Sequence, residues 1–147
     1  MTTITITTHA SAKRNHGDFC EENFDYMLNG EITGKDSLPF DVASDVTHMG
    51  VGYSVKSDHF TLVSARLVSG DNMGEILDTY FARVHSTRWA YVGRNDIAYI
   101  MDMGEFREFL ETFATLERES QKNGGGVKVR CRAESRKMLD WLTERVA

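Results

Sequence analysis

Hydrophobic and polar residues alternate in blocks along this chain, and each block has the period of one type of secondary structure. Apolar residues recur at helical spacing in four segments, at about 16–28, 73–84, 106–116 and 134–146. Short β-prone runs lie between them, at 41–47, 51–57, 60–68, 89–93, 97–101 and 127–131. This order of blocks predicts an α/β (α+β) fold in which helices flank a central mixed β-sheet.

Turn and cap residues indicate how several of these blocks begin and end. The glycine-bearing turn His48–Gly50 lies between two β-prone runs and predicts a β-hairpin, to which the run at 60–68 adds a third strand. Asp102 and Glu105 fit a capping box at the start of the helix whose apolar residues span 106–116. The aromatic residues of the run at 89–93 could stack on bases, but short aromatic strands are more typical of a core.

The chain length favours a single domain over residues 1–147, because a chain of this size can bury a core without disulfides. Residues 1–12 are expected to be a frayed tail or an edge strand, and residues 31–39 a polar connection. The composition is 41% apolar and 27% charged, without an apolar run of bilayer length, so no membrane partner is expected. The absence of a secretory pattern and the distant pair Cys20 and Cys131 favour a cytoplasmic protein with reduced thiols.

Candidate chemistry gathers on the hairpin at 41–57. Side chains two apart on a strand share a face, so Ser54 and Lys56 point to the same side of the second strand. Asp41 and Asp45 likewise share a face of the first strand. If the two faces coincide, a carboxylate, a hydroxyl and an ammonium group converge on one side of the hairpin.

This arrangement resembles the PD-(D/E)xK nuclease superfamily, which includes Holliday-junction resolvases and many restriction endonucleases. The resemblance covers roughly the first half of the chain. Asp45 matches the acid on one strand and Lys56 the lysine of the acid-x-lysine motif on the next. Glu22, or its neighbour Glu21, matches the glutamate of the preceding helix. The resemblance implies a restriction-endonuclease-like core and metal-dependent hydrolysis of phosphodiester bonds in DNA, branched DNA included.

The resemblance also implies a role for each matched residue. Asp45 and Glu22 would hold Mg²⁺ or Mn²⁺, and Lys56 would orient or help to deprotonate the attacking water. Ser54 stands where the family has a carboxylate. It is expected to be a weak or water-mediated ligand, because a hydroxyl binds a hard cation less strongly than a carboxylate does. Asp41 remains an alternative to Asp45 as the first acid.

The net charge of −5 conceals a strong asymmetry along the chain. Residues 118–137 hold seven basic and two acidic residues, a net charge of +5, which leaves −10 on the remainder. A local basic surface on an acidic protein can bind phosphates, although ordinary solvated charges would give the same pattern. The candidate nucleic-acid-binding residues are Lys128, Arg130, Arg132, Arg136 and Lys137.

A second hypothesis is a non-enzymatic interaction protein, for example a phage or mobile-element factor that binds a host protein through its acidic surface. The acidic remainder of the chain and the missing carboxylate at Ser54 favour it. The sequence leaves open whether the chain is an enzyme. It also leaves open whether the chain acts alone or as a homodimer.

Overall fold

The computed structural model describes residues 1–5, 31–32, 46–49, 51–57, 60–62, 72–84, 86–93, 95, 97–118, 127–132 and 135–146. These residues form nine strands in two sheets together with three helices. The fold is therefore of mixed α and β type, as the alternating blocks of the sequence predict. The helix expected at about 16–28 lies outside the described residues.

The larger sheet has six strands and is mixed. In sheet order its strands are β1 (Thr2–Thr5), β7 (Ile97–Met101), β6 (Arg88–Val92), β4 (Val51–Ser57), β3 (Val46–His48) and β2 (Glu31–Ile32). β4 and β6 run parallel, whereas every other pair in this sheet is antiparallel. Of the two alternatives for the N-terminal residues, an edge strand is therefore correct for residues 2–5.

A smaller antiparallel sheet has the strand order β5 (Phe60–Leu62), β9 (Val127–Cys131) and β8 (Ala114–Arg118). The prediction that the run beginning at Phe60 joins the hairpin in a meander is therefore wrong. β4 already has β3 on one side and β6 on the other, so no edge of β4 is available to β5. The strand that completes the meander is β2, within the segment expected to be a polar connection.

The three helices are α2 (Met73–Arg83), α3 (Met103–Phe113) and α4 (Arg136–Arg145). Each begins at a side chain that accepts a hydrogen bond from a backbone amide, which satisfies one of the unpaired donors of the first turn. The capping box is confirmed, since Asp102 accepts from the Glu105 amide at 2.8 Å and Glu105 accepts from the Asp102 amide at 3.1 Å. None of the helices within the described ranges is long and apolar enough to cross a membrane.

Helix α3 ends earlier than its apolar stripe predicts. α3 stops at Phe113, and Ala114 already has an extended backbone with φ −87° and ψ 156°. Leu116 was expected to continue the helix, but it lies in β8 opposite Val129 and packs against the core. The alternation of inward Leu116 with exposed Thr115 is compatible with a strand as well as with a helix. Pairing with β9 makes this segment a strand.

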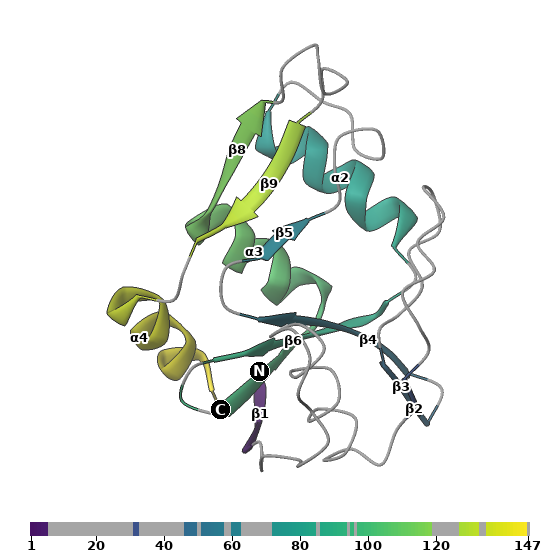
Figure 1. Cartoon of the computed structure of the whole chain (residues 1–147), viewed down its shortest axis with the longest axis vertical. Coiled ribbons are helices and arrows are strands. Elements are labelled where there is room, and N and C mark those ends of the chain that lie inside the picture. Colours follow the sequence, from purple (N-terminus) through teal and green to yellow (C-terminus); the bar gives the residue numbers. More distant parts are fainter. Residues whose placement is uncertain are drawn as a thin grey trace.

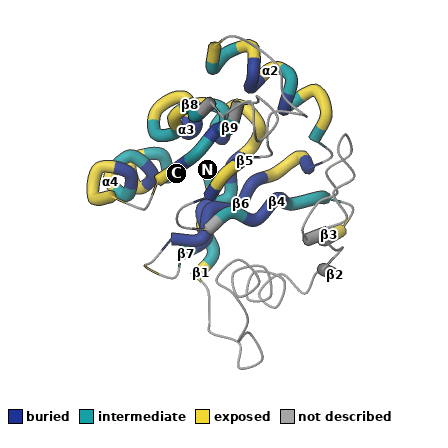
Figure 2. The backbone as a smooth tube through the Cα atoms, turned by 45° about the horizontal axis from the view of Figure 1, so that its top comes forward, coloured by how far each residue is buried: buried dark blue, intermediate teal, exposed yellow. Residues whose placement is uncertain are grey.

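An aromatic core fills the space on one side of the larger sheet, where α2, α3 and the smaller sheet all lie (Figure 1). The Trp89 ring on β6 stacks on Phe106 of α3, with centroids 5.2 Å apart and planes 8° apart. Phe60 of the smaller sheet stacks on Phe109 of α3 at 6.5 Å. Buried residues accordingly concentrate on β6, on β7 and on the inner sides of the helices (Figure 2). The aromatic residues of β6 and β7 thus belong to the core.

Candidate functional site

The β3–β4 hairpin forms where the sequence predicts it. Val46 pairs with Tyr53 and His48 pairs with Val51 in an antiparallel ladder. The turn contains Met49, whose φ of 50° is uncommon for a residue with a side chain and whose surface is 89% exposed. The tip of the hairpin therefore lies in solvent, and the described side chains with catalytic potential are farther along β4.

Ser54 and Lys56 lie on the same face of β4, in accordance with the two-residue period of a strand. In the parallel β4–β6 ladder, Ser54 pairs with Trp89 and Lys56 with Tyr91. Both aromatic residues belong to the core beneath α2 and α3. Val55 between them packs into a second apolar cluster with Ala90, on the opposite face of the sheet. The hydroxyl and the ammonium group are thus on the side of the larger sheet that carries the helices.

The two polar residues of this face differ in their access to solvent. Ser54 is 4% exposed, whereas Lys56 is only partly buried. β4 is an interior strand of the larger sheet, so a ligand must approach these residues across the face of the sheet. Solvent therefore reaches this face of β4 at Lys56 rather than at Ser54.

The carboxylates of the predicted metal site, Asp45 and Glu22, lie outside the described residues, as do their alternatives Asp41 and Glu21. In the part of the chain that the structure describes, no group of three or more His, Cys, Asp or Glu residues could hold a metal ion. The hydroxyl of Ser54 is by itself a weak ligand for a hard cation. A metal site on this face of β4 would therefore need carboxylates from outside the described residues, such as those of the predicted set.

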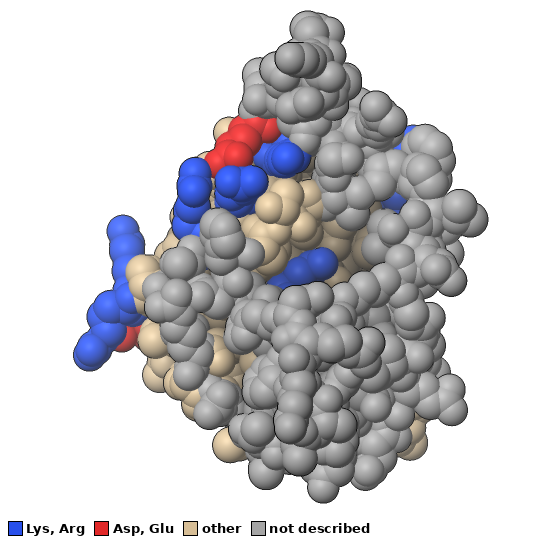
Figure 3. Space-filling model, in the orientation of Figure 1, with Lys and Arg blue, Asp and Glu red and all other residues tan. Residues whose placement is uncertain are grey.

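The predicted phosphate-binding residues on β9 and directly after it form a basic stripe, namely Lys128, Arg130 and Arg132. Val129 and Cys131 alternate with them and are buried, which places the basic residues on the outer face of the smaller sheet. Figure 3 shows basic side chains gathered at the surface over β9, beside a hollow in this view of the molecule. The stripe is therefore open to a ligand on this side.

One acidic residue interrupts the basic stripe. Glu117 of β8 lies with one carboxylate oxygen 2.9 Å from Nη2 of Arg132 and the other 3.4 Å from Nη1 of Arg130. Sequence reasoning did not identify Glu117, because its relation to the arginines depends on the β8–β9 register and residues 114–118 were not recognised as a strand. The acidic side chains visible among the basic ones in Figure 3 lie over these two strands.

Arg136 and Lys137 lie in the first turn of α4 and are exposed. Nε of Arg136 is 3.4 Å from the carboxylate of Asp140, one turn farther along the same helix. Basic residues are unfavourable near the positive end of a helix dipole, so an anion bound there would relieve repulsion. The sequence thus places these two residues correctly at a helix start, while basic side chains over α4 form a group apart from the stripe in Figure 3.

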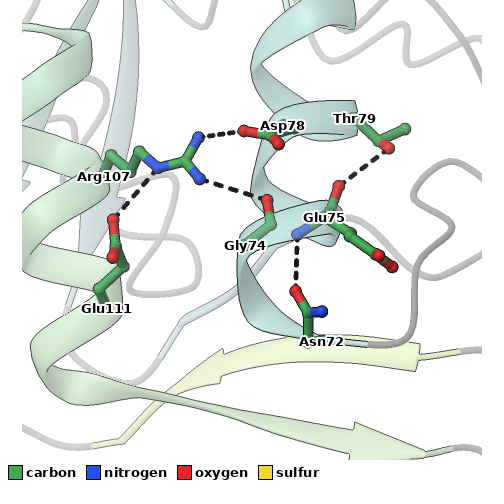
Figure 4. Close-up of polar contacts among 7 residues, drawn as sticks. All are labelled: Asn72, Gly74, Glu75, Asp78, Thr79, Arg107 and Glu111. Carbon is green, nitrogen blue, oxygen red and sulfur yellow. Dashed lines mark hydrogen bonds and ion pairs between the residues drawn. The ribbon is translucent and has the colours of Figure 1, made fainter.

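A separate polar cluster joins α2 to α3 (Figure 4). The Arg107 guanidinium of α3 donates to the carboxylates of Asp78 and Glu111 and to the carbonyl oxygen of Gly74 at 3.2 Å. The hydrogen bond to Asp78 is the main reason that the pKa of Arg107 is raised above its ordinary value, which keeps the side chain charged. The cluster ties two helices together and has no nucleophile or proton-transfer pair, so we assign it a structural role.

Comparison with known proteins adds no family assignment. No protein-family model, no curated protein and no solved structure matches this chain. Inference about function therefore depends on the geometry of the hairpin, on the basic stripe and on the resemblance of the hairpin residues to the nuclease motif.

Proposed function

We propose that the protein is a metal-dependent endonuclease or a resolvase-like DNA-processing enzyme. The observation that carries this proposal is the shared face of Ser54 and Lys56 on β4, beside the antiparallel strand β3. The nuclease motif needs an acid on one strand and an acid-x-lysine on the next. β3 begins one residue after Asp45, and β4 holds Ser54-Val55-Lys56.

The ladder register supports Asp45 as the first acid. Val46 pairs with Tyr53, and if the same register extended by one more residue, position 45 would oppose Ser54. Directly opposed residues of an antiparallel pair lie on the same side, with Cβ atoms about 4.5–5.5 Å apart. On this proposal, Asp45, Ser54 and Lys56 occupy one face of the hairpin, and Asp45 is preferred over Asp41 because it is the nearer of the two in this register.

The order of elements supports a restriction-endonuclease-like core. The antiparallel strands β2, β3 and β4 are followed by β5 of the smaller sheet, by α2 and then by β6, which lies parallel to β4. A mixed sheet with helices packed against it agrees with the core that the resemblance implies. In this arrangement the proposed catalytic face of β4 is the face that packs beneath α2 and α3.

The proposed roles follow from the chemistry of the side chains. Mg²⁺ or Mn²⁺, when bound, would supply the positive charge that activates a water molecule and polarises the phosphate. Asp45 and Glu22, or its neighbour Glu21, would hold the ion, because carboxylate oxygens suit hard cations. Lys56 would orient the attacking water and stabilise the negative charge that develops on the phosphate. Ser54 would make a weak or water-mediated contact.

Incubation with DNA tests the proposal. Branched, double-stranded and single-stranded DNA are each incubated with the protein in Mg²⁺, in Mn²⁺ and in EDTA. We expect cleavage of at least one of these DNAs in the presence of a divalent ion and no cleavage in EDTA. Cleavage that persists in EDTA, or none under any condition with folded protein, would exclude a metal-dependent nuclease.

We expect Ser54→Glu to tighten Mn²⁺ binding, because it adds a third carboxylate to the proposed ligand set. The same change should lower stability in EDTA by about 1–3 kcal/mol, since position 54 is only 4% exposed and the added carboxylate would then be buried without a partner. Calorimetry with Mn²⁺ and thermal unfolding measure the two effects, with Ser54→Ala as the matched control. Equal Mn²⁺ affinity in wild type and Ser54→Glu would mean that Ser54 is not near a metal.

The alternative proposal is a non-enzymatic interaction protein that binds a host protein through its acidic surface. The buried hydroxyl of Ser54, at the position where the nuclease motif has a carboxylate, favours it. The chain outside residues 118–137 carries a net charge of −10, which suits a basic partner surface. On this alternative, Asp45→Asn and Lys56→Met leave partner binding unchanged, and no DNA is cleaved.

A further inference from the structure

We infer that the outer face of the smaller sheet binds the phosphate backbone of double-stranded DNA and that Glu117 is an internal anion which the phosphates displace. The inference depends on the proposed function only in taking DNA as the ligand. It does not depend on catalysis, because binding by this face needs neither a metal nor the β3–β4 hairpin.

The spacing of the basic stripe suits a chain of phosphates. Lys128 and Arg130 alternate on β9, and Arg132 follows directly after its last residue. Residues two apart on a strand are about 6.6–6.8 Å apart. Thr61 of β5 and Thr115 of β8 pair with Arg130 from either side and are exposed. Arginine, lysine and threonine side chains are common donors to phosphate oxygens. The outer face thus presents donors of the kind that contact a DNA backbone.

The composition of this sheet favours double-stranded over single-stranded DNA. The large apolar residues of its three strands point inward, where Phe60, Leu62 and Val129 belong to the aromatic core. Single-strand binding without sequence preference uses aromatic side chains on which bases stack. Among the described side chains of the outer face there is no aromatic ring, so contact is made to phosphates, which a duplex presents at the higher charge density.

Glu117 occupies the place of a ligand anion between two arginines. Its contact with Arg132 is short at 2.9 Å, but its contact with Arg130 is 3.4 Å, longer than a strong charge-assisted hydrogen bond of about 2.7–2.9 Å. Within the described part of the chain, the buried Nε of Arg130 donates no hydrogen bond. Within the described residues, the Arg130 guanidinium is therefore held only by its long contact with Glu117 at Nη1, and a phosphate oxygen can replace the carboxylate there.

Exchange of Glu117 for phosphate also explains how an overall acidic protein can bind DNA selectively. While Glu117 pairs with both arginines, the described residues of this face carry three positive charges and one negative charge. A single small anion therefore gains little binding free energy when it displaces the carboxylate of Glu117. A rigid row of phosphates contacts all three basic residues at once, so its binding offsets the loss of the internal ion pairs.

The test is fluorescence anisotropy with duplex and single-stranded DNA of equal length, measured across a salt series in EDTA. Lys128/Arg130/Arg132→Ala should lower the slope of log affinity against log salt by roughly two to three, since each phosphate contact contributes about 0.7–0.9. Glu117→Gln should raise duplex affinity about three- to tenfold, because it removes two partly exposed ion pairs that compete with the ligand. Glu144→Gln on α4 removes the same charge outside the stripe and is the matched control.

Three results would overturn the inference. They are equal duplex affinity for Glu117→Gln and Glu144→Gln, tighter binding of single strands than of duplex, and no salt-dependent DNA binding by wild type. Unfolding midpoints that match wild type show that the variants are folded. If the triple variant is unfolded, the duplex affinity of Glu117→Gln is the test of the inference. Binding without any cleavage in Mg²⁺ would reject the nuclease proposal alone, whereas cleavage without a contribution from the stripe would reject this inference alone.

Discussion

Lys56→Met is expected to lower metal-dependent DNA cleavage by roughly 100- to 1,000-fold, the usual cost of removing one group that stabilises transition-state charge. Methionine keeps much of the apolar stem of lysine, which lies on β4 next to Tyr91 of β6. The fold should therefore survive, and the loss should appear in the rate of the chemical step. Single-turnover cleavage at saturating DNA measures that rate.

The control for this prediction is Arg83→Met. Arg83 is an exposed basic residue in the last turn of α2, outside the proposed site, and its replacement makes the same change in net charge. We expect Arg83→Met to cleave within about threefold of wild type, since surface substitutions away from a site usually change free energies by no more than about 0.5 kcal/mol. If Lys56→Met and Arg83→Met cleave equally well, Lys56 has no catalytic role.

Trp89→Ala should have the largest effect on stability, a loss of about 3–5 kcal/mol in the free energy of unfolding. The Trp89 side chain is fully buried and stacks on Phe106 with centroids 5.2 Å apart. Its indole also donates a hydrogen bond to the Tyr80 hydroxyl of α2 at 3.1 Å. Truncation would therefore leave a cavity where β6 meets α2 and α3. Urea denaturation monitored by circular dichroism measures the change.

Tyr80→Phe is the matched control for the hydrogen bond. It removes the hydroxyl that accepts from Trp89 but keeps the ring, so it should cost about 1–3 kcal/mol, the penalty of leaving the buried indole N–H without that acceptor. The difference between Trp89→Ala and Tyr80→Phe in the free energy of unfolding separates the contribution of ring packing from that of the hydrogen bond. A loss below about 1 kcal/mol in Trp89→Ala would contradict a core centred on this stack, because large buried aromatic truncations cost more.

Local signals in the sequence account for the elements that were predicted correctly. The glycine-bearing turn between two β-prone runs specifies the β3–β4 hairpin, and the reciprocal pair Asp102 and Glu105 specifies the start of α3. The two-residue period of a strand predicts the shared face of Ser54 and Lys56. These features depend on residues close together in the chain, so residue type and spacing are enough to predict them.

The errors all concern pairing between distant segments. β5 joins β9, about 70 residues away, instead of its neighbour β4, because β4 is already enclosed by β3 and β6. Leu116 leaves the helical stripe because β8 can pair with β9. No local pattern specifies either choice, since both depend on which strand edges remain available once the aromatic core has formed.

In the candidate site, too, local features were predicted from the sequence and contacts between distant segments were not. Lys128, Arg130 and Arg132 were recognisable because they alternate with Val129 and Cys131 along the sequence. Glu117 was not, because its contacts with two of them arise only when β8 pairs with β9. A charge pattern read along the chain therefore identifies a basic stripe but not the acid that neutralises part of it.

The central claim is that one metal site joins Asp45, Ser54 and Lys56 to a glutamate of the helix predicted at about 16–28. Anomalous diffraction from crystals grown with Mn²⁺ tests this claim most directly. We predict a Mn²⁺ peak about 2.0–2.6 Å from a carboxylate oxygen of Asp45 and from one of Glu22 or Glu21. The peak should lie on the face of β4 that carries Ser54 and Lys56. No peak there at saturating Mn²⁺, or an Asp45 side chain on the face opposite Lys56, would contradict the account.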